Sequence, residues 1–288
     1  MTEEPLRYRA WKRAVQAVST RVGEPTQLDR LDDVEWDGVV VLDACRWDAL
    51  DAAADWPFDY ARSPGSATDE WLGVVADHGC FEGAVVATGN VKYEFFDVGA
   101  DEVAHCWETD WDSGLGTVLP EPVLDRADAF LADGHRKVVA HVMPPHAPYV
   151  ARVAETWLPA YPQTGAWDHA GAADASEDDT PSAQVAMAAG LIDIDRARAS
   201  YEAAVESAWK TLVPYVADWI GRDLDVVVTA DHGEVFGGLD GYGFYGHPNR
   251  CHIRPLVRVP FERFTRPAER ADAAESVEQK LQALGYAE

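Results

Sequence analysis

Short apolar runs alternate with longer amphipathic stretches along this chain. Runs rich in β-branched residues predict buried strands at residues 38–43, 83–89, 137–143, 224–230 and 256–260. Segments with helical periodicity lie between them, the longest at residues 122–134 and 194–221. Buried strands that alternate with helices are typical of a parallel sheet covered on both faces. The pattern therefore predicts an α/β fold with a mostly parallel central sheet and helices on both faces.

Two segments do not follow this alternation. Residues 5–20 have the pattern of an amphipathic helix with a basic face, so we expect residues 1–36 to form an N-terminal helical extension. Residues 163–188 are small, polar and acidic, which predicts a long flexible surface loop that can act as a lid. Nothing else divides the chain, and we expect residues 1–288 to form a single domain.

The composition is that of a globular protein. The chain has 288 residues, 47% of them hydrophobic, with 11 Trp, which is enough to bury a sizeable core. It contains no apolar stretch of 18 residues, so we expect no transmembrane helix. The first residues lack the apolar core of a signal peptide, which favours a cytoplasmic protein. The four cysteines form no CxxC pair, which indicates buried, reduced thiols.

The charge is strongly negative and is spread along the whole chain. Fifty acidic residues against 24 basic ones give a formal net charge of -26. Self-repulsion of this size is tolerable where salt screens it, so the surface is typical of a salt-adapted, halophilic protein. Phosphate binding by a nucleic-acid-binding protein needs a basic face, and the charge therefore excludes nucleic acid as the expected partner.

Candidate metal ligands stand at the ends of two predicted strands. Asp231 and His232 directly follow residues 224–230, and Asp43 ends residues 38–43. The carboxyl ends of parallel strands meet at one edge of a sheet, where ligands bind. Oxygen and nitrogen ligands together favour zinc or manganese. The sequence therefore predicts a metal site, although an Asp after a strand is also a common helix N-cap.

Histidines and hydroxyls supply the other candidate chemistry. The segment HVMPPHAPY carries His141 and His146, which could bind a metal or an anion or belong to a structural loop. His247, in GHPNR, is a candidate for contact with an anionic group.

Ser66 and Thr68 precede a predicted helix, where such residues are either ordinary N-caps or nucleophiles beside the helix N-terminus. Cys45 is a rival nucleophile, but a thiol just after a buried strand is more often part of the core.

The order and spacing of four motifs resemble those of the alkaline phosphatase superfamily, and within it the sulfatase-like branch. These motifs are VVVLDACRWD, HVMPPHAPY, TADHGEVFG and GHPNR, and the resemblance runs from about residue 37 to residue 260. It implies an alkaline-phosphatase-like fold. It also implies that Asp43, Asp231 and His232 bind a divalent metal ion, zinc or manganese first, with calcium or magnesium as alternatives.

The resemblance also implies catalytic roles. The stretch GSATDEWL is similar to the Gly-x-x-Thr stretch of phosphoethanolamine transferases, which implies Thr68 as the nucleophile and Ser66 as its reserve. His141, His146 and His247 match positions that bind the anionic group of the substrate or a second metal. We count His141 among the metal ligands, and His146 and His247 among the catalytic residues.

Two departures from the family pattern limit the prediction. The Cys-x-Pro-x-Arg motif of sulfatases, whose Cys becomes formylglycine, is absent, because Cys45 is followed by Arg-Trp-Asp-Ala. A second Asp is also absent after Asp43, where Ala44 stands, which favours one metal ion or a second one held loosely by histidines.

These motifs predict a metal-dependent hydrolase or phosphotransferase that acts on a phosphate ester through a Thr nucleophile. One alternative is a sulfate-ester hydrolase that uses an unmodified hydroxyl or Cys45. Another is a degenerate sulfatase-like protein that binds an anionic glycan or lipid head group without turnover. In each case the expected partner is a small anionic ester or head group.

Overall fold

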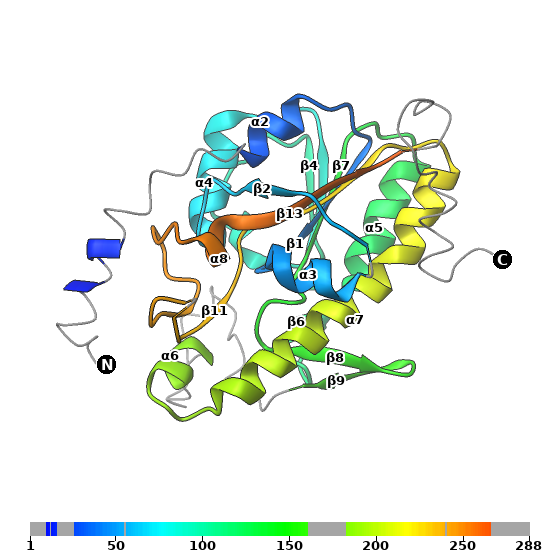
Figure 1. Cartoon of the computed structure of the whole chain (residues 1–288). Helices are drawn as coiled ribbons and strands as arrows, with labels where there is room; N and C mark the ends of the chain where they lie inside the picture. The colour runs from blue at the N-terminus through cyan, green and yellow to red at the C-terminus, as the bar shows by residue number, and fades with distance from the viewer. Residues whose placement is uncertain are drawn as a thin grey trace.

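A seven-stranded sheet forms the centre of the computed structural model (Figure 1), which describes residues 10–11, 13–15, 26–54, 56–160, 183–239 and 241–265. The strand order is β2-β13-β10-β1-β7-β3-β4. These strands are β1 (Gly38–Leu42), β2 (Tyr60–Arg62), β3 (Val85–Thr88), β4 (Glu102–His105), β7 (Val138–Val142), β10 (Val226–Ala230) and β13 (Arg258–Phe264). The sheet confirms the predicted α/β fold.

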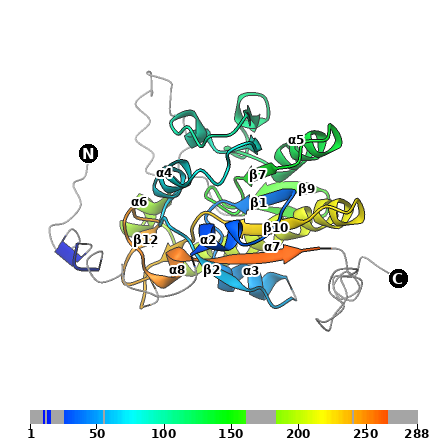
Figure 2. The same cartoon turned by 90° about the horizontal axis from the view of Figure 1, so that it is seen from above.

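The five strands from β10 to β4 are parallel, and β13 runs antiparallel beside β10. β1 lies between β7 and β10 in the middle of the sheet (Figure 2), and all of its residues are buried. A central parallel strand has no face exposed to water, which explains its continuous run of Val residues. Four of the five predicted strands match β1, β3, β7 and β10.

The fifth predicted strand, residues 256–260, is wrong at its start. Residues Arg254–Val257 form the short helix α8, and β13 begins at Arg258. Pro255 at the beginning of α8 has a fixed φ that suits a first helical turn, and an apolar run alone does not distinguish a short helix from a strand.

Helices cover both faces of the sheet, as predicted (Figure 1). On one face the core includes Val40 and Leu42 of β1, with side chains of the helices α3, α5 and α7. On the other face Val39 and Val41 pack against α2 and α4. The helices are α2 (Gln27–Asp32), α3 (Trp47–Ala53), α4 (Thr68–His78), α5 (Pro120–Ala132) and α7 (Ile194–Gly221).

Short elements complete the part of the chain that the structure describes. They are η1 (Val91–Glu94), η2 (Cys106–Glu108), α6 (Ala183–Ala188), and three two-stranded sheets of β5 (Trp111–Asp112) with β6 (Thr117–Val118), β8 (Val150–Val153) with β9 (Thr156–Pro159), and β11 (Val235–Phe236) with β12 (Tyr245–Gly246). Among the helices that the structure describes, none combines the length and the apolar character that a membrane-spanning segment requires.

Two predicted segments fall largely outside the described residues. Within the expected helix of residues 5–20, residues 10–11 and 13–15 are helical. The predicted loop of residues 163–188 is wrong at its end, because Ala183–Ala188 forms α6. The hexamer AQVAMA consists largely of residues with high helix propensity, and small side chains alone do not distinguish a short helix from a loop. The rest of the predicted loop lies outside the described residues.

Candidate active site

Strand register brings the predicted metal ligands to one edge of the sheet. Leu42 of β1 pairs with Ala230 of β10, so Asp43 and Asp231 are the first residues beyond two paired strand ends. His141 of β7 pairs with Val41 on the other side of β1. The carboxyl ends of three parallel strands therefore deliver these three side chains to the same place, as the sequence predicts.

The turn after β1 is held in an unusual conformation. Ala44 has a φ of 58°, in the left-handed region that a residue with a Cβ seldom adopts. Its backbone N–H donates to Oδ1 of Asp231 over 3.0 Å, and its carbonyl accepts from the Tyr201 hydroxyl at 2.8 Å. Tyr201 also accepts from the N–H of Arg46 at 2.8 Å. These bonds fix the chain next to Asp43 and fix one oxygen of Asp231.

Asp43, Asp231 and His232 form a compact, fully buried cluster. One ligand atom of each lies within 4.8 Å of the others. Nε2 of His232 is 3.3 Å from Oδ2 of Asp231 and 3.7 Å from Oδ1 of Asp43. The Nδ1 atom of His232 faces the carbonyl of Gly233 at 2.9 Å, which orients Nε2 toward the two carboxylates.

The donor set fits a metal ion. Oδ1 of Asp43 and Nε2 of His141 are buried and have no hydrogen-bond partner. Nε2 of His141 lies 3.8 Å from Asp43 and 3.9 Å from Asp231, beyond hydrogen-bond range but directed at both carboxylates. A buried polar atom without a partner costs about 1–3 kcal/mol. A cation between these atoms would remove that cost, so Asp43, Asp231, His232 and His141 are a suitable ligand set.

The electrostatics of the cluster favour a cation as well. Burial raises the pKa of Asp43 well above its ordinary value, and repulsion by Asp231 raises it further. For Asp231 burial is outweighed by attraction to His232 and His141, which lowers its pKa. Burial lowers the pKa of His232 and brings that of His141 to about 4. Both imidazoles are therefore neutral near pH 7, the form that binds a metal.

Thr68 reaches this cluster and is not a helix N-cap. It is the first residue of α4, whose N-cap is Ala67 without a side-chain bond. Its hydroxyl donates to Oδ2 of Asp231 at 2.8 Å and lies 3.2 Å from Nε2 of His232. The hydroxyl therefore stands at a helix N-terminus and touches two of the predicted metal ligands.

The two rival nucleophiles are placed differently. The Ser66 hydroxyl contacts Glu70, the carbonyl of Pro248 and the backbone N–H of Cys251, each at 3.0 Å, and no hydrogen bond joins it to the metal ligands. Cys45 is fully buried, and burial raises the pKa of its thiol well above the ordinary value. A thiol that resists ionisation is a poor nucleophile.

His146 and His247 lie together beside the cluster. Their ring centres are 5.0 Å apart, and the ring of His247 is 4.5 Å from that of His232. Burial lowers the pKa of His146 to about 3 and that of His247 to about 4. Nδ1 of His247 lies 3.3 Å from Oε2 of Glu234, a buried carboxyl whose pKa burial raises to about 7. The structure thus brings both predicted histidines to the site, with a partner that the sequence reading missed.

Three further residues were missed. Asn90 donates its side-chain N–H to Oδ2 of Asp43, and the hydroxyl of Tyr93 lies 3.1 Å from Nδ1 of His141. Lys92 pairs with Asp69 at 3.1 Å, and its charge acts to lower the pKa of both Asp43 and His247. Asn90 follows β3, so the same strand-end argument that found Asp43 would have found it.

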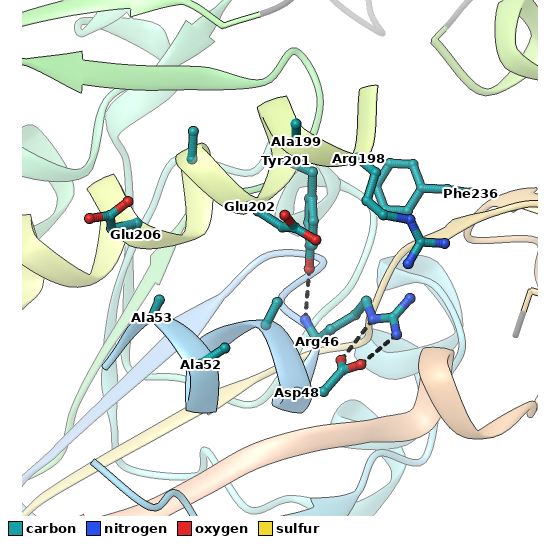
Figure 3. Close-up of a pocket in the computed structure, with 12 residues that line it drawn as sticks. Arg46, Asp48, Ala52, Ala53, Arg198, Ala199, Tyr201, Glu202, Glu206 and Phe236 are labelled. Atoms are coloured by element: carbon teal, nitrogen blue, oxygen red, sulfur yellow. Dashed lines mark hydrogen bonds and ion pairs between the residues drawn. The ribbon is translucent and has the colours of Figure 1, made fainter. Parts of the chain in front are cut away.

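A separate open groove of about 410 Å³ lies between α3, α7 and β11 (Figure 3). Arg46 lines it and is held by Asp48 through Nε at 2.8 Å and Nη2 at 2.6 Å. The Tyr201 hydroxyl points toward the backbone of Arg46 in the same view. None of the predicted ligands or catalytic residues lines this groove.

Comparisons with known proteins identify the fold. No protein-family profile matches the chain, and no curated sequence matches it. Among solved structures, the integral membrane protein lipooligosaccharide phosphoethanolamine transferase A from Neisseria meningitidis is similar, with 14% identity and a TM-score of 0.53. The match covers 96% of this chain but only 56% of the transferase. The soluble domain of that transferase gives 14% identity and a TM-score of 0.54, over 85% of this chain and 81% of the domain.

A 2-O glycosaminoglycan sulfatase also matches, with 12% identity over 81% of this chain and 64% of that one. The TM-score of this match is 0.45. At these identities the likeness shows the fold alone. The resemblance to the alkaline phosphatase superfamily is therefore confirmed as a likeness of fold.

Proposed function

We propose that this protein is a metal-dependent enzyme that transfers a phosphoryl group from a phosphate ester to water or to an acceptor alcohol. Thr68 is the nucleophile. The main support is the position of the Thr68 hydroxyl, which lies 2.8 Å from Asp231 within a buried set of candidate metal-ligand side chains. The fold shared with a phosphoethanolamine transferase supports an ester of phosphoric acid.

Asp43, Asp231 and His232 would hold the divalent ion, with His141 as a fourth donor. When bound, such an ion lowers the pKa of a nearby hydroxyl and neutralises charge on phosphoryl oxygens. The ligands are carboxylate oxygens and imidazole nitrogens without a thiolate, so zinc and manganese are the first candidates.

The chain's own residues supply the remaining steps. Oγ1 of Thr68 attacks phosphorus, and its proton passes to Oδ2 of Asp231, the carboxylate oxygen 2.8 Å away. A phosphorus–oxygen bond forms while the bond to the leaving oxygen breaks, which leaves a phosphothreonine. The start of α4 adds a partial positive charge beside the transferred group.

His146 and His247 serve the leaving group and the acceptor. Burial keeps both neutral in the free protein, but a bound phosphate raises the pKa of a nearby imidazole by its negative charge. One of them can then protonate the leaving oxygen. In the second half of the reaction it accepts the proton of water or of the acceptor alcohol as that oxygen attacks phosphorus. The bond between phosphorus and Oγ1 breaks, and Oγ1 takes its proton back from Oδ2 of Asp231, which restores Thr68.

Phosphate is a better candidate than sulfate for this site. The motif that produces formylglycine is absent, and the thiol of Cys45 is buried and resists ionisation. Two nucleophiles of a sulfatase, formylglycine and the Cys45 thiol, therefore have no support here. Only an unmodified hydroxyl is left as a nucleophile for sulfate-ester hydrolysis.

Turnover by the metal-loaded protein tests the proposal. The purified full chain is loaded with zinc or manganese and assayed with aryl phosphate, an alkyl aryl phosphodiester and aryl sulfate. We expect hydrolysis of a phosphate ester at a rate above that of the sulfate. Preferred turnover of the sulfate would favour the sulfatase alternative. Stoichiometric metal and ligand binding without turnover of any ester would favour a binding protein.

A further inference from the structure

The carboxylate of Glu70 joins the start of α4 to the segment of residues 247–252. Its Oε2 accepts from the backbone N–H of Ser66 at 3.0 Å and from that of Arg250 at 3.1 Å. Its Oε1 lies 2.6 Å from Nε2 of His252. Glu70 and these two partners in the segment are about 180 positions apart in sequence, so the carboxylate is a cross-link between distant parts of the chain.

Ser66 provides a second set of contacts between the same two parts. Its hydroxyl lies 3.0 Å from Oε2 of Glu70 and 3.0 Å from the carbonyl of Pro248. It also accepts from the backbone N–H of Cys251 at 3.0 Å. Ser66 is fully buried. The hydroxyl considered as a reserve nucleophile is thus part of a buried junction.

The segment needs such a junction because it contains no regular structure. Residues 247–253 belong to neither helix nor strand, and Arg250 has a φ of 57°. His247 is the first residue of this segment, and its ring is 4.5 Å from the ring of His232. A displacement of the segment would move His247 relative to Thr68.

We propose that Glu70 is a positioning residue that holds His247 over the site of Thr68, through its bonds to Ser66, Arg250 and His252. The inference rests on the proposed function for its effect on turnover. Among the described residues, the hydrogen bonds of Glu70 go to Ser66, Arg250 and His252, and none goes to a candidate metal ligand. Its role is to fix the distance between two groups that act on the same phosphoryl group, where small displacements are costly.

A double-mutant cycle tests the positioning role. Glu70→Gln keeps the size of the side chain and removes the charge that binds four donors. In the zinc- or manganese-loaded full chain, we expect Glu70→Gln to lower kcat by about tenfold at unchanged metal content. In a His247→Ala background, Glu70→Gln should cause less than about a twofold further loss, because the residue it positions is gone.

The matched control is Glu121→Gln, the same change in the first turn of α5, where Glu121 binds Trp157. We expect it to leave kcat within about twofold of the wild type. Losses from Glu70→Gln and His247→Ala that multiply fully would overturn the inference, as would an unchanged kcat in Glu70→Gln.

Hydrogen exchange gives a readout that does not depend on turnover. Since the N–H of Arg250 binds Glu70, exchange in a peptide covering residues 247–252 should become about tenfold faster in Glu70→Gln. A peptide covering β10 should not change. Unchanged exchange at residues 247–252 would contradict the junction.

These two measurements separate the inference from the proposed function. If the wild type turns over no ester, the proposed function fails, and the exchange result alone decides whether Glu70 holds the segment. If the wild type is active and Glu70→Gln exchanges faster without losing kcat, the positioning role fails while the proposed function stands.

Discussion

The hydroxyl oxygen of Thr68 lies 2.8 Å from Oδ2 of Asp231, although 163 positions separate the two residues. One stands at the first position of α4 and the other just beyond β10. Their contact places a candidate nucleophile against a candidate metal ligand. It is also the contact that distinguishes Thr68 from Ser66, whose hydroxyl is bound to Glu70 and Pro248.

Replacing Thr68 should therefore abolish turnover without loss of metal. We expect Thr68→Ala to lower kcat by about a thousandfold or more, because no oxygen remains to form the covalent intermediate. Ser66→Ala is the matched control and should lose less than about tenfold, as expected for one buried hydrogen bond. The measurements are steady-state kinetics and metal analysis of both variants. The assignment of Thr68 fails if Thr68→Ala keeps full activity or if Ser66→Ala is the inactive variant.

Asp43→Asn should have opposite effects on stability with and without metal. Burial and repulsion by Asp231 raise the pKa of Asp43 above 3.8, so its carboxyl costs stability as the pH rises from 3.8 to its folded pKa. At pH 8 without metal, we expect the variant to be more stable than the wild type. Saturating zinc at about 100 times its Kd should stabilise the wild type by about 2.7 kcal/mol and the variant less.

Urea unfolding at pH 8, with EDTA or with zinc, measures both effects of Asp43→Asn. Asp133→Asn is the control, because it makes the same change at an exposed carboxyl, the C-cap of α5. A variant that is less stable than the wild type in EDTA, or equally stabilised by zinc, would argue against a metal-binding role for Asp43.

The parts of the site that follow strand ends could be predicted from the sequence. Asp43, His141 and Asp231 follow from apolar runs, because parallel strands end at one edge. The contacts of Thr68 could not be derived from local sequence, since a Thr before Asp-Glu is usually an N-cap and the observed N-cap is Ala67. The resemblance to phosphoethanolamine transferases selected Thr68 where propensity did not.

The junction around Glu70 could not be predicted at all. Its partners His252 and Arg250 are far away in sequence, and no periodicity connects them with α4. The edge strands β2 and β4 were also missed, because they are short and only partly buried, which weakens the apolar signal. The single domain, the N-terminal extension, the salt-adapted surface and the cytoplasmic location stay predictions.

The contribution of Glu70 to stability should disappear in acid. Burial alone would raise its pKa, but hydrogen bonds from His252 and Ser66 outweigh burial and lower the pKa from 4.5 to about 2. A carboxyl with a lowered folded pKa stabilises the protein above its unfolded pKa and loses that effect as the pH falls toward the folded pKa. The wild type should therefore exceed Glu70→Gln in free energy of unfolding at pH 6, and the difference should shrink by pH 3.

Urea unfolding of both proteins at pH 6 and pH 3 tests this expectation. Glu121→Gln is the control. Its difference from the wild type in unfolding free energy, at both pH values, shows how acid affects a Glu→Gln change in general. A difference between the wild type and Glu70→Gln that stays constant from pH 6 to pH 3 would mean that the charge of Glu70 contributes nothing.

Gly233→Ala should disrupt the turn that follows the metal ligands. A Cβ at Gly233 would lie 2.1 Å from the carbonyl oxygen of Pro255, a backbone atom that cannot rotate away. The N–H of Gly233 donates to the carbonyl of Leu256 at 2.8 Å, so the two segments cannot separate without losing that bond. We expect a loss of about 2–3 kcal/mol in unfolding free energy and weaker metal binding, because His232 is the adjacent residue. Gly221→Ala, at the end of α7, should be neutral or slightly stabilising, because beyond its chain neighbours and the backbone of its own helix nothing lies within 4 Å of the added Cβ. Equal stability of the two variants, measured by urea unfolding, would contradict the close approach at Gly233.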